Sequence, residues 1–399
     1  MSYIYIWIST IVRILELKVE NLSPEMKATL KYLAGIAGPS GYGSKTTAQQ
    51  ISEDSMPSSH NNLTAIVTGA TSGIGLETAR VLAKRGVRVV MPARDLSKAE
   101  RVKESIQKES PQAEIIILEI DLSSFGSIQR FCSEFLSLGL PLHILINNAG
   151  KYSQKLEFSE DKIELTFATN YLGHFLLTEM LLGKMVETAA ESCIEGRIVN
   201  VSSVIHNWVN PKHFSFMKLL NPKSYNGTKA YAQSKLANIL HAKELSRQLK
   251  AKKANVTINA VHPGIIKTGI TRDYRGFLTG MQNILFLGFD LSIFLYVQTK
   301  LYCLLIGIFS SDSLYFVASK LLKSTSQGAA TTCYVALSPR VEGMSGKYFA
   351  DCNESHCSAL ANDESNARKL WKQTRALMHR RFLLPVGKCD EEGEEASTY

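Results

Sequence analysis

The 399-residue sequence contains no CxxC pair and no set of cysteines and histidines at the spacing of a zinc site. Its seven cysteines, an odd number, are scattered between positions 132 and 389. This pattern argues against a disulfide-stapled scaffold and predicts reduced, mostly structural thiols in a reducing compartment. The sequence also lacks a stripe of lysine and arginine with interleaved aromatic residues. The net charge of +9 therefore does not indicate nucleic-acid binding, and we expect no nucleic-acid partner.

A convincing secretory signal is absent as well. Residues 3–12 are apolar, but no basic residue precedes them, Arg13 follows at once, and the run is too short to span a bilayer. A longer apolar stretch, residues 283–309, includes Asp290 and Lys300. Charges inside a membrane span are costly. Three interpretations therefore stay open for this stretch: a spanning helix, an amphipathic helix on a membrane surface, or an unusual soluble or disordered insertion.

The composition, with 45% hydrophobic and 20% charged residues, is ordinary for a globular protein that buries a core. Residues 1–60 are rich in Gly, Ser, Thr and Gln, which predicts a flexible N-terminal arm. We expect one folded domain over residues 61–350, with an apolar insertion at about 281–312. Residues 351–399 are expected to form a C-terminal basic helix and an acidic tail.

From Thr64 onward, short runs rich in Ile, Val and Leu alternate with amphipathic stretches of helical length. Nearly continuous apolar strands separated by helices predict a parallel sheet covered on both faces. Right-handed crossovers then give a doubly wound, three-layer α/β/α fold of the Rossmann type. The expected strands are 64–68, 87–91, 114–120, 143–146, 197–201 and 255–261, and the expected helices include 74–85, 97–109 and 230–249.

A glycine-rich turn, Thr68-Gly69-Ala70-Thr71-Ser72-Gly73-Ile74-Gly75, follows the first expected strand and opens a helix. Glycines permit a tight turn and a close approach to a pyrophosphate. The helix N-terminus offers unpaired N–H groups and the positive end of the helix dipole. An ordinary strand-to-helix turn is the alternative. We expect a dinucleotide to contact this turn at Gly69, Thr71, Ser72, Gly73, Ile74 and Gly75.

The glycine spacing GxxxGxG resembles the TGxxxGIG fingerprint of the short-chain dehydrogenase/reductase family. The resemblance covers residues 64–275 and resumes at about 326–350. It implies a Rossmann fold and an oxidoreductase that interconverts a carbonyl and an alcohol with a nicotinamide cofactor. The other matching motifs, in chain order, are Asn147-Asn148-Ala149-Gly150, Asn170-Tyr171-Leu172-Gly173-His174, Ser203, Tyr231-x-x-x-Lys235, and Pro263-Gly264 with Thr268.

Four residues are candidates for catalysis. Tyr231 and Lys235 are four positions apart, so they share one face of a helix. A phenol with a pKa of about 10 is a poor acid–base group at neutral pH. We expect the Lys235 ammonium, together with the positive nicotinamide of the oxidised cofactor, to lower the pKa of Tyr231. Ser203 is expected to polarise the substrate carbonyl, with Ser202 as the alternative. The resemblance implies that Asn170 anchors a water that connects the lysine to solvent; an asparagine bonded to backbone is the alternative.

The end of the second expected strand bears on the choice of dinucleotide. Ala93 stands where NAD-dependent members of the family usually carry Asp, and Arg94 follows. A guanidinium binds a 2′-phosphate bidentately, so we predict NADP(H). The alternative is that Arg94 is a solvated charge and Asp95 supplies the acid. By resemblance, further cofactor contacts are Asp121 (alternatively a helix cap), Leu122, Asn147, Ala149, Gly150, Tyr231, Lys235, Pro263, Gly264 and Thr268.

From Met26 onward the chain resembles plant short-chain dehydrogenases that are retinol-dehydrogenase-like or associated with the translocon of the chloroplast inner envelope. The resemblance implies that location, with the cytoplasm or an endomembrane surface as the alternative. It also marks residues 1–25 and 281–312 as extensions. Residues 369–384 include basic side chains and apolar anchors at helical spacing. They are either a calmodulin target or a terminal helix packed on the domain.

Two functions stay open. The first is an NADPH-dependent oxidoreductase for an apolar small molecule, with carbonyl and alcohol forms as substrate and product. The second is an NADPH-binding redox sensor that regulates chloroplast protein import. Membrane association and homo-oligomer formation are left open, and no metal is expected.

Overall fold

The computed structural model describes residues 31–32, 34–55, 63–211, 214–220, 222, 224–266 and 322–382. The two extensions at 1–25 and 281–312, the apolar stretch 283–309 and Thr268 lie outside these ranges. No helix within the described ranges combines the length and apolar character needed to cross a bilayer.

An eight-stranded sheet runs through the described part of the chain in the order β3-β2-β1-β4-β5-β6-β7-β8. Neighbouring strands from β3 to β7 are parallel, and β8 is added antiparallel at one edge. The strands are β1 Thr64–Val67, β2 Arg88–Ala93, β3 Ile115–Glu119, β4 Ile144–Asn147, β5 Gly196–Val201, β6 Val256–His262, β7 Tyr348–Ala350 and β8 Asn353–Glu354.

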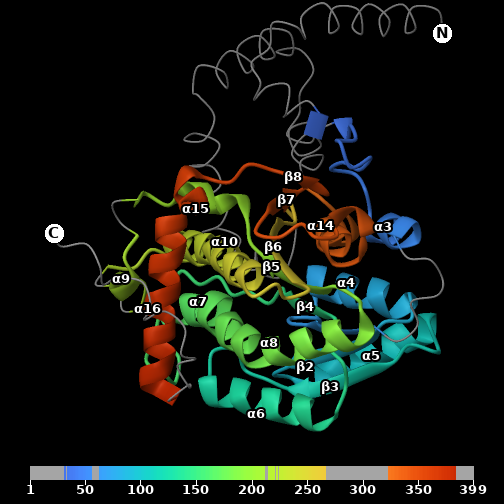
Figure 1. Cartoon of the computed structure of the whole chain (residues 1–399), viewed down its shortest axis with the longest axis horizontal. Coiled ribbons are helices and arrows are strands. Elements are labelled where there is room, and N and C mark those ends of the chain that lie inside the picture. Colours follow the sequence, from blue (N-terminus) through green and yellow to red (C-terminus); the bar gives the residue numbers. More distant parts are fainter. Residues whose placement is uncertain are drawn as a thin grey trace, which may run out of the picture.

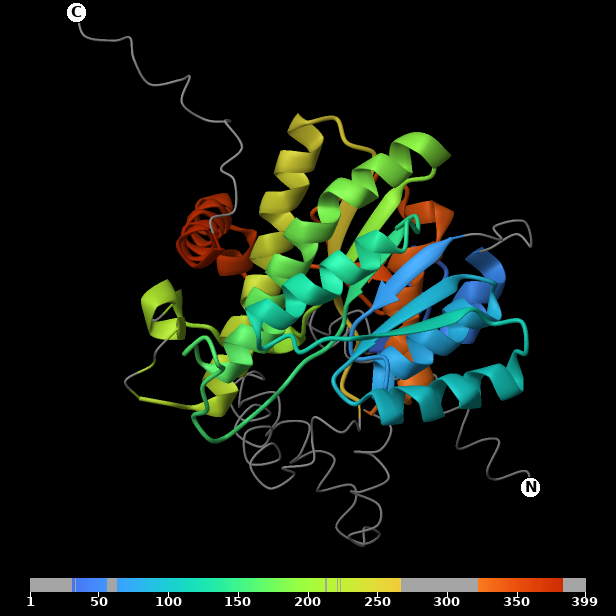
Figure 2. The same ribbon diagram turned by 90° about the horizontal axis from the view of Figure 1, so that it is seen from below.

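Helices cover both faces of this sheet (Figures 1 and 2). Two hydrophobic clusters, one on each face, form the core between the sheet and the helices. One face carries α3 Ala48–Ser55, α4 Gly73–Lys84, α5 Leu96–Glu109 and α14 Thr325–Leu337, and the other carries α6 Phe125–Ser137, α8 Gly173–Ser192, α10 Gly227–Ala251 and α16 Glu364–Phe382. The short helices are α7 Leu165–Phe167, α9 Phe216–Leu220, α15 Ala359–Asn362, the π-helix η1 Ala168–Leu172, and the 3₁₀-helices η2 Val204–Trp208 and η5 Pro339–Val341.

The predicted doubly wound Rossmann fold is confirmed, and it fixes where a ligand would bind. The chain runs outward from β1 to β3 and then returns to form β4 on the other side of β1. In such sheets the crevice beside the carboxyl ends of the strands at this reversal is the usual binding place. All four residues of β1 and of β4 are buried, as expected for strands covered on both faces.

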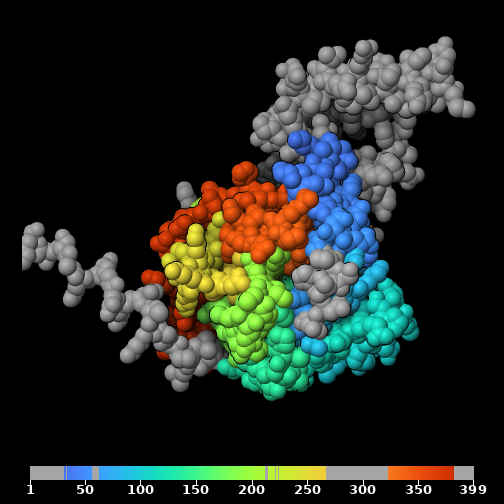
Figure 3. Space-filling view, turned by 45° about the vertical axis from the view of Figure 1, so that its right-hand side comes forward, coloured from blue at the N-terminus to red at the C-terminus, as the bar shows by residue number. Residues whose placement is uncertain are grey.

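The expectation of a flexible N-terminal arm is wrong for the part that the structure describes. Residues 34–55 lie on the domain, where α3 packs along α14 (Figure 3). Asn353 of β8 holds this segment, because its Oδ1 accepts from Ser40 N at 2.9 Å and its Nδ2 donates to Tyr42 O at 3.0 Å. The glycines that indicated flexibility instead form turns, since Gly35 and Gly41 have φ of 73° and 82°.

The C-terminal helix α16 also packs on the domain, against α10. Leu370, Trp371 and Met378 are buried in the core cluster that α8 and α10 build. Thr374 of the same helix lies in hydrogen-bond contact with the Tyr171 hydroxyl, at 2.9 Å between the oxygens. The apolar anchors at 371 and 378 therefore face the domain and not solvent.

The close contact between α8 and the loop after β3 gives a matched pair of glycine variants. A Cβ at Gly173, the first residue of α8, would lie 2.2 Å from the carbonyl oxygen of Leu122. A Cβ at Gly183, in the same helix, would meet no atom within 4 Å. We expect Gly173→Ala to lower the free energy of unfolding by about 1–3 kcal/mol. Gly183→Ala should leave it unchanged or raise it by up to about 1 kcal/mol. Urea unfolding measures both, and equal stability of the two variants would contradict the packing described.

Candidate active site

The glycine-rich turn links the end of β1 to the start of α4 at the topological reversal. Gly69 and Gly73 have φ of 69° and 59°, in the left-handed region that favours glycine. Within α4 the first backbone bond to the residue four positions earlier runs from Leu76 N to Ser72 O, at 3.3 Å. The amides of the first helical turn lack intrahelical partners of this kind, as at any helix N-terminus.

The geometry of the turn fits a dinucleotide pyrophosphate. A Cβ at Gly75 would lie 2.4 Å from Asn148 Nδ2, and a Cβ at Gly69 would lie 2.9 Å from the Cα of Ala149. Only glycine therefore allows the turn to pack this closely on the residues after β4. The turn therefore leaves space beside the first amides of α4, and this arrangement binds phosphate in this fold.

Thr68 ties the ends of β1 and β4 together. Its Oγ1 accepts from Asn148 N and Ala149 N, each at 2.9 Å, and lies 2.9 Å from His174 Nε2. Its carbonyl accepts from Asn148 Nδ2 at 2.8 Å. Thr68, Asn148 and His174 all stand inside the motifs found in the sequence. Their role as scaffold of the turn was missed, because it depends on contacts between residues about 80–106 positions apart.

Tyr231 and Lys235 lie together on α10. The Lys235 Nζ is 5.5 Å from the centre of the Tyr231 ring and donates to Val201 O, at the end of β5, at 2.8 Å. Tyr231 is half-buried, and Tyr152 packs its ring edge-on against it, with centroids 5.8 Å apart. The spacing of four residues therefore brings the two groups onto one face of the helix, as expected.

Burial shifts the pKa values of both groups of this pair. Burial raises the pKa of Tyr231 to about 12 and lowers the pKa of Lys235 to about 8. Both shifts have the same cause, because desolvation penalises the charged form of each group. The lowering of the Tyr231 pKa that we expect from the ammonium together with the oxidised nicotinamide stays a prediction.

The two serines after β5 have different surroundings. Ser202 is buried, and its hydroxyl donates to the main-chain oxygen of Lys235 at 2.7 Å. Ser203 is half-buried, and its Oγ accepts a long bond, 3.4 Å, from Ile205 N. The Ser202 hydroxyl is thus committed to the scaffold, whereas Ser203 lies at the carboxyl end of β5 with a more accessible hydroxyl.

Asn170 is fully buried in the π-helix η1. Its Oδ1 accepts from Lys151 N at 2.7 Å, and its Nδ2 donates to Lys151 O at 2.9 Å and to Ser234 Oγ at 3.0 Å. The two bonds to Lys151 match the alternative of an asparagine bonded to backbone. The bond to Ser234 places Asn170 beside the turn of α10 that carries Lys235. The Lys151 side chain pairs with Glu157 at 2.9 Å. Single π-turns inside helices are frequent at functional sites.

The residues expected around the adenosine half have distinct environments. Arg94 is exposed directly after β2. Asp95 caps α5 by accepting from Lys98 N at 2.8 Å, so part of its carboxylate is engaged by the helix. Asp121 Oδ1 accepts from Ser123 N at 2.8 Å, and the N-cap of α6 is Ser124, not Asp121.

Some expected contact residues face the interior or lie elsewhere. Asn147 is 1% exposed, and its Nδ2 donates to Thr178 Oγ1 at 3.0 Å and to Asn200 Oδ1 at 2.8 Å, as its inward position in β4 requires. Leu122 is buried under Gly173. Ala149 and Gly150 follow β4 and are half-buried, and after β6 Pro263 is buried and Gly264 half-buried.

These features can be compared with known proteins. A family profile described as short chain dehydrogenase matches residues 63–215. The chain is 46% identical over 339 residues to "Short-chain dehydrogenase TIC 32 B, chloroplastic" of Brassica napus, with 85% of this chain and 95% of that protein covered. The chain belongs to the short-chain dehydrogenase family. It is also 37% identical over 336 residues to retinol dehydrogenase 14 of Homo sapiens, with coverage of 81% and 88%.

Solved structures agree on the fold. A Mycobacterium Paratuberculosis protein matches with a TM-score of 0.56 and 25% identity, covering 81% of this chain and 97% of that one. The Pseudomonas aeruginosa RhlG/NADP active-site complex matches with a TM-score of 0.52 and 19% identity, covering 73% and 96%. The predictions of family and fold are thus confirmed. As a family member, the chain is an oxidoreductase of alcohol and carbonyl groups.

A buried histidine at the base of the site should make stability depend on pH. His174 is 2% exposed, and desolvation lowers its pKa from 6.5 to about 4. Between these values the unfolded chain binds a proton that the folded chain does not, so stability falls as pH falls from 6.5 toward 4. At about 1.4 kcal/mol per pKa unit, His174 alone contributes on the order of 3 kcal/mol. Urea unfolding at a series of pH values should give a shallower dependence for His174→Gln, and an unchanged slope would contradict this assignment.

Proposed function

We propose that this protein is an NADP(H)-dependent oxidoreductase that interconverts a carbonyl and an alcohol on an apolar small molecule. The observation that carries the proposal is the Tyr231–Lys235 pair on α10, which the bond from Lys235 Nζ to Val201 O ties to the end of β5. The cofactor, when bound, supplies or accepts the hydride. Relatives named retinol dehydrogenases support an apolar substrate.

Tyr231 is the proton donor to the substrate oxygen in the direction of reduction. With a pKa raised by burial to about 12, the phenol is protonated at neutral pH, but it is also a weaker acid than a free tyrosine, so donation requires stabilisation of the phenolate. The Lys235 ammonium, 5.5 Å from the ring centre, stabilises the phenolate that donation leaves. Oxidation needs the phenolate at the start, so the reverse direction should become faster as pH rises.

Ser203 is the second group on the substrate oxygen. Its hydroxyl donates a hydrogen bond to the charge that develops there. Ser202 is unsuited to this role, because its hydroxyl already donates its hydrogen bond to the Lys235 carbonyl. Asn170 is a positioning residue that holds the Lys151 backbone and Ser234 next to the catalytic turn of α10.

The glycine turn and Arg94 would hold the cofactor. The amides at the start of α4 suit the pyrophosphate. Arg94 is exposed at the end of β2, where a 2′-phosphate would be placed, and the cap at Asp95 leaves that carboxylate less suited to a ribose hydroxyl. Gly69, Thr71, Ser72, Gly73, Ile74 and Gly75 line the phosphate side, and Asp121, Ala149, Gly150, Pro263, Gly264 and Thr268 complete the proposed contacts.

A second candidate function has one observation in its favour. The relatives named "Short-chain dehydrogenase TIC 32", "chloroplastic", support a location in the chloroplast, where the redox-sensing role in protein import that the resemblance implies would operate. The calmodulin interpretation is harder to reconcile with α16, because Trp371 and Met378 are buried and the helix would have to leave the domain to present them. Tyr231→Phe separates the two functions in vivo. Loss of the protein's function in the variant would mean that the oxidoreductase reaction is required, whereas unchanged regulation of protein import would favour the redox sensor.

Removal of the phenol oxygen tests the catalytic assignment. Tyr231→Phe should lower kcat for NADPH-dependent reduction of apolar aldehydes and ketones by about 10²–10⁴-fold, the usual contribution of a positioned acid–base group. Tyr334→Phe is the matched control, because Tyr334 lies on α14, on the other face of the sheet. NADPH absorbance follows the reaction. A Tyr231→Phe enzyme with wild-type kcat would refute the role of the phenol.

Arg94 should decide the choice between the two dinucleotides. Loss of a charged hydrogen bond to the 2′-phosphate costs about 1.5–3 kcal/mol, so Arg94→Ala should raise KM for NADPH by about 10–100-fold and leave KM for NADH nearly unchanged. Arg101→Ala, an exposed arginine on α5, controls for net charge. The wild-type protein should prefer NADPH. Equal or higher kcat/KM with NADH, or an unchanged NADPH affinity in Arg94→Ala, would exclude this assignment.

A further inference from the structure

His206 touches the backbone of the proposed catalytic serine. It lies in η2 with 1% of its surface exposed, and its Nδ1 is 2.7 Å from the main-chain oxygen of Ser203. Its Nε2 is 3.1 Å from the backbone nitrogen of Ser358. A carbonyl oxygen only accepts and a backbone N–H only donates. The ring must therefore carry its proton on Nδ1 and leave Nε2 bare, which assigns one neutral tautomer.

His262 binds the same turn from the other side. It is the last residue of β6, and its Nδ1 accepts from Val204 N at 3.3 Å. The residues that follow, Pro263 and Gly264, border the proposed cofactor site. The turn is thus bonded at Ser203 and at Val204. His262 links the Val204 amide to β6, and His206 links the Ser203 carbonyl to the segment before α15.

We propose that His206 and His262 are positioning residues that clamp the Ser203 turn between the end of β6 and the C-terminal segment. This inference rests on the proposed function of Ser203. Within the described residues, the Ser203 hydroxyl accepts one long bond, from Ile205 N. Its direction is therefore set by the backbone of residues 203–206, which the two imidazoles hold.

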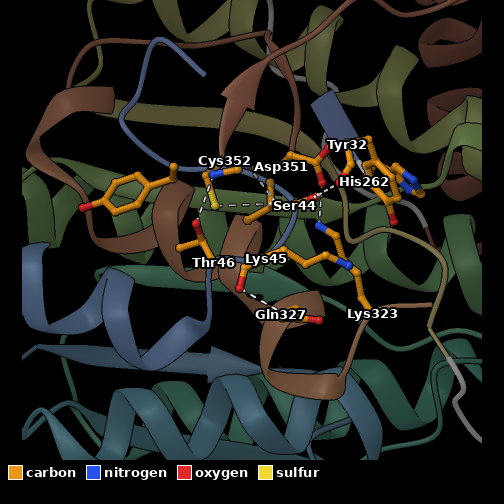
Figure 4. A network of polar contacts seen from close by, with 12 residues as sticks. Tyr32, Ser44, Lys45, Thr46, His262, Lys323, Gln327, Asp351 and Cys352 are labelled. Atoms are coloured by element: carbon orange, nitrogen blue, oxygen red, sulfur yellow. Dashed lines mark hydrogen bonds and ion pairs between the residues drawn. The ribbon is translucent and has the colours of Figure 1, made fainter. Parts of the chain in front are cut away.

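The surroundings keep both rings neutral. The groups that face His206 are the Tyr348 ring of β7, edge-on at 5.1 Å, the Ser358 amide and His262. Lys323 lies near His262, and its Nζ is paired with Asp351 at 2.5 Å (Figure 4). Burial lowers the pKa of His206, and burial followed by the charge of Lys323 lowers that of His262 to about 3. A proton on Nε2 of His206 would oppose the Ser358 N–H.

Variants at His206 separate the two bonds. His206→Phe removes both, and we expect kcat to fall about 10–100-fold, since a misplacement of about 1 Å in a catalytic group costs about that factor. KM for NADPH should change by less than about twofold, because the ring of His206 bonds to Ser203 and Ser358 and not to the glycine turn or Arg94, which are proposed to hold the phosphates. In His206→Asn the amide can still donate to Ser203 O, so most of kcat should return. An unchanged kcat in His206→Phe overturns the proposal.

A matched control is another buried histidine that accepts a backbone bond. His143 lies before β4, at the amino ends of the strands, and its Nδ1 accepts from Thr64 N at 3.1 Å. His143→Phe should keep wild-type kcat. A loss of kcat equal to that of His206→Phe would mean that removing any buried histidine has this effect, and would overturn the specific role of His206.

Nitrogen-15 NMR of the histidine rings tests the clamp without enzyme activity, and also covers the case in which His206→Phe fails to fold. In the wild-type protein at pH 7, the His206 ring should show a protonated Nδ1 and an unprotonated Nε2. A protonated Nε2 overturns the clamp. If the wild-type protein oxidises no NADPH with any carbonyl compound, the proposed function fails, whereas the ring assignment still decides the geometry proposed here.

Discussion

The bond between the Lys235 ammonium and the Val201 carbonyl is the contact on which the site depends. It joins α10 to the end of β5, and the Ser202 hydroxyl returns a bond to the Lys235 carbonyl at 2.7 Å. The Lys235 side chain reaches from the helix to the strand, and the Ser202 side chain reaches from the end of the strand back to the helix. Tyr231 lies one helical turn before Lys235, and Ser203 lies two residues beyond Val201. The reciprocal pair therefore fixes the distance between the two elements that supply the proposed catalytic groups.

A second set of buried polar contacts does the same for the glycine turn. The Thr68 hydroxyl binds the amides after β4 and meets His174, whose Nδ1 lies 3.1 Å from the Asn170 carbonyl. Asn170 in turn bonds to Ser234 of α10. A continuous chain of hydrogen bonds thus runs from the phosphate turn, through α8 and η1, to the helix that carries Tyr231. Each buried group is satisfied by the next, so the network adds rigidity without leaving a desolvated donor alone.

How far the sequence predicts this arrangement depends on the range of the contact. The six expected strands, β1 to β6, are recovered within one or two residues, because buried parallel strands are continuous apolar runs, whereas the short edge strands β7 and β8 were not predicted. The position of Tyr231 and Lys235 on one helix face follows from helical periodicity, and their proposed role follows from the family resemblance. By contrast, the fold of residues 34–55 was missed, since glycine in a tight turn and glycine in a flexible arm look alike in sequence. Nor does any local pattern predict that His206 meets Ser358, 152 positions later.

In the proposed mechanism Lys235 supplies a positive charge, and within the described part of the chain a carbonyl and not a carboxylate anchors it. Lys235 is 2% exposed, desolvation is the cause of its lowered pKa, and the partner that holds its ammonium is a neutral carbonyl. At a pKa of about 8 the amine is still mostly charged at pH 7. A carboxylate at that position would stabilise the ammonium but cancel its field. A carbonyl dipole anchors the group and leaves the positive charge to act on an oxygen that becomes negative, whether on Tyr231 or on the substrate.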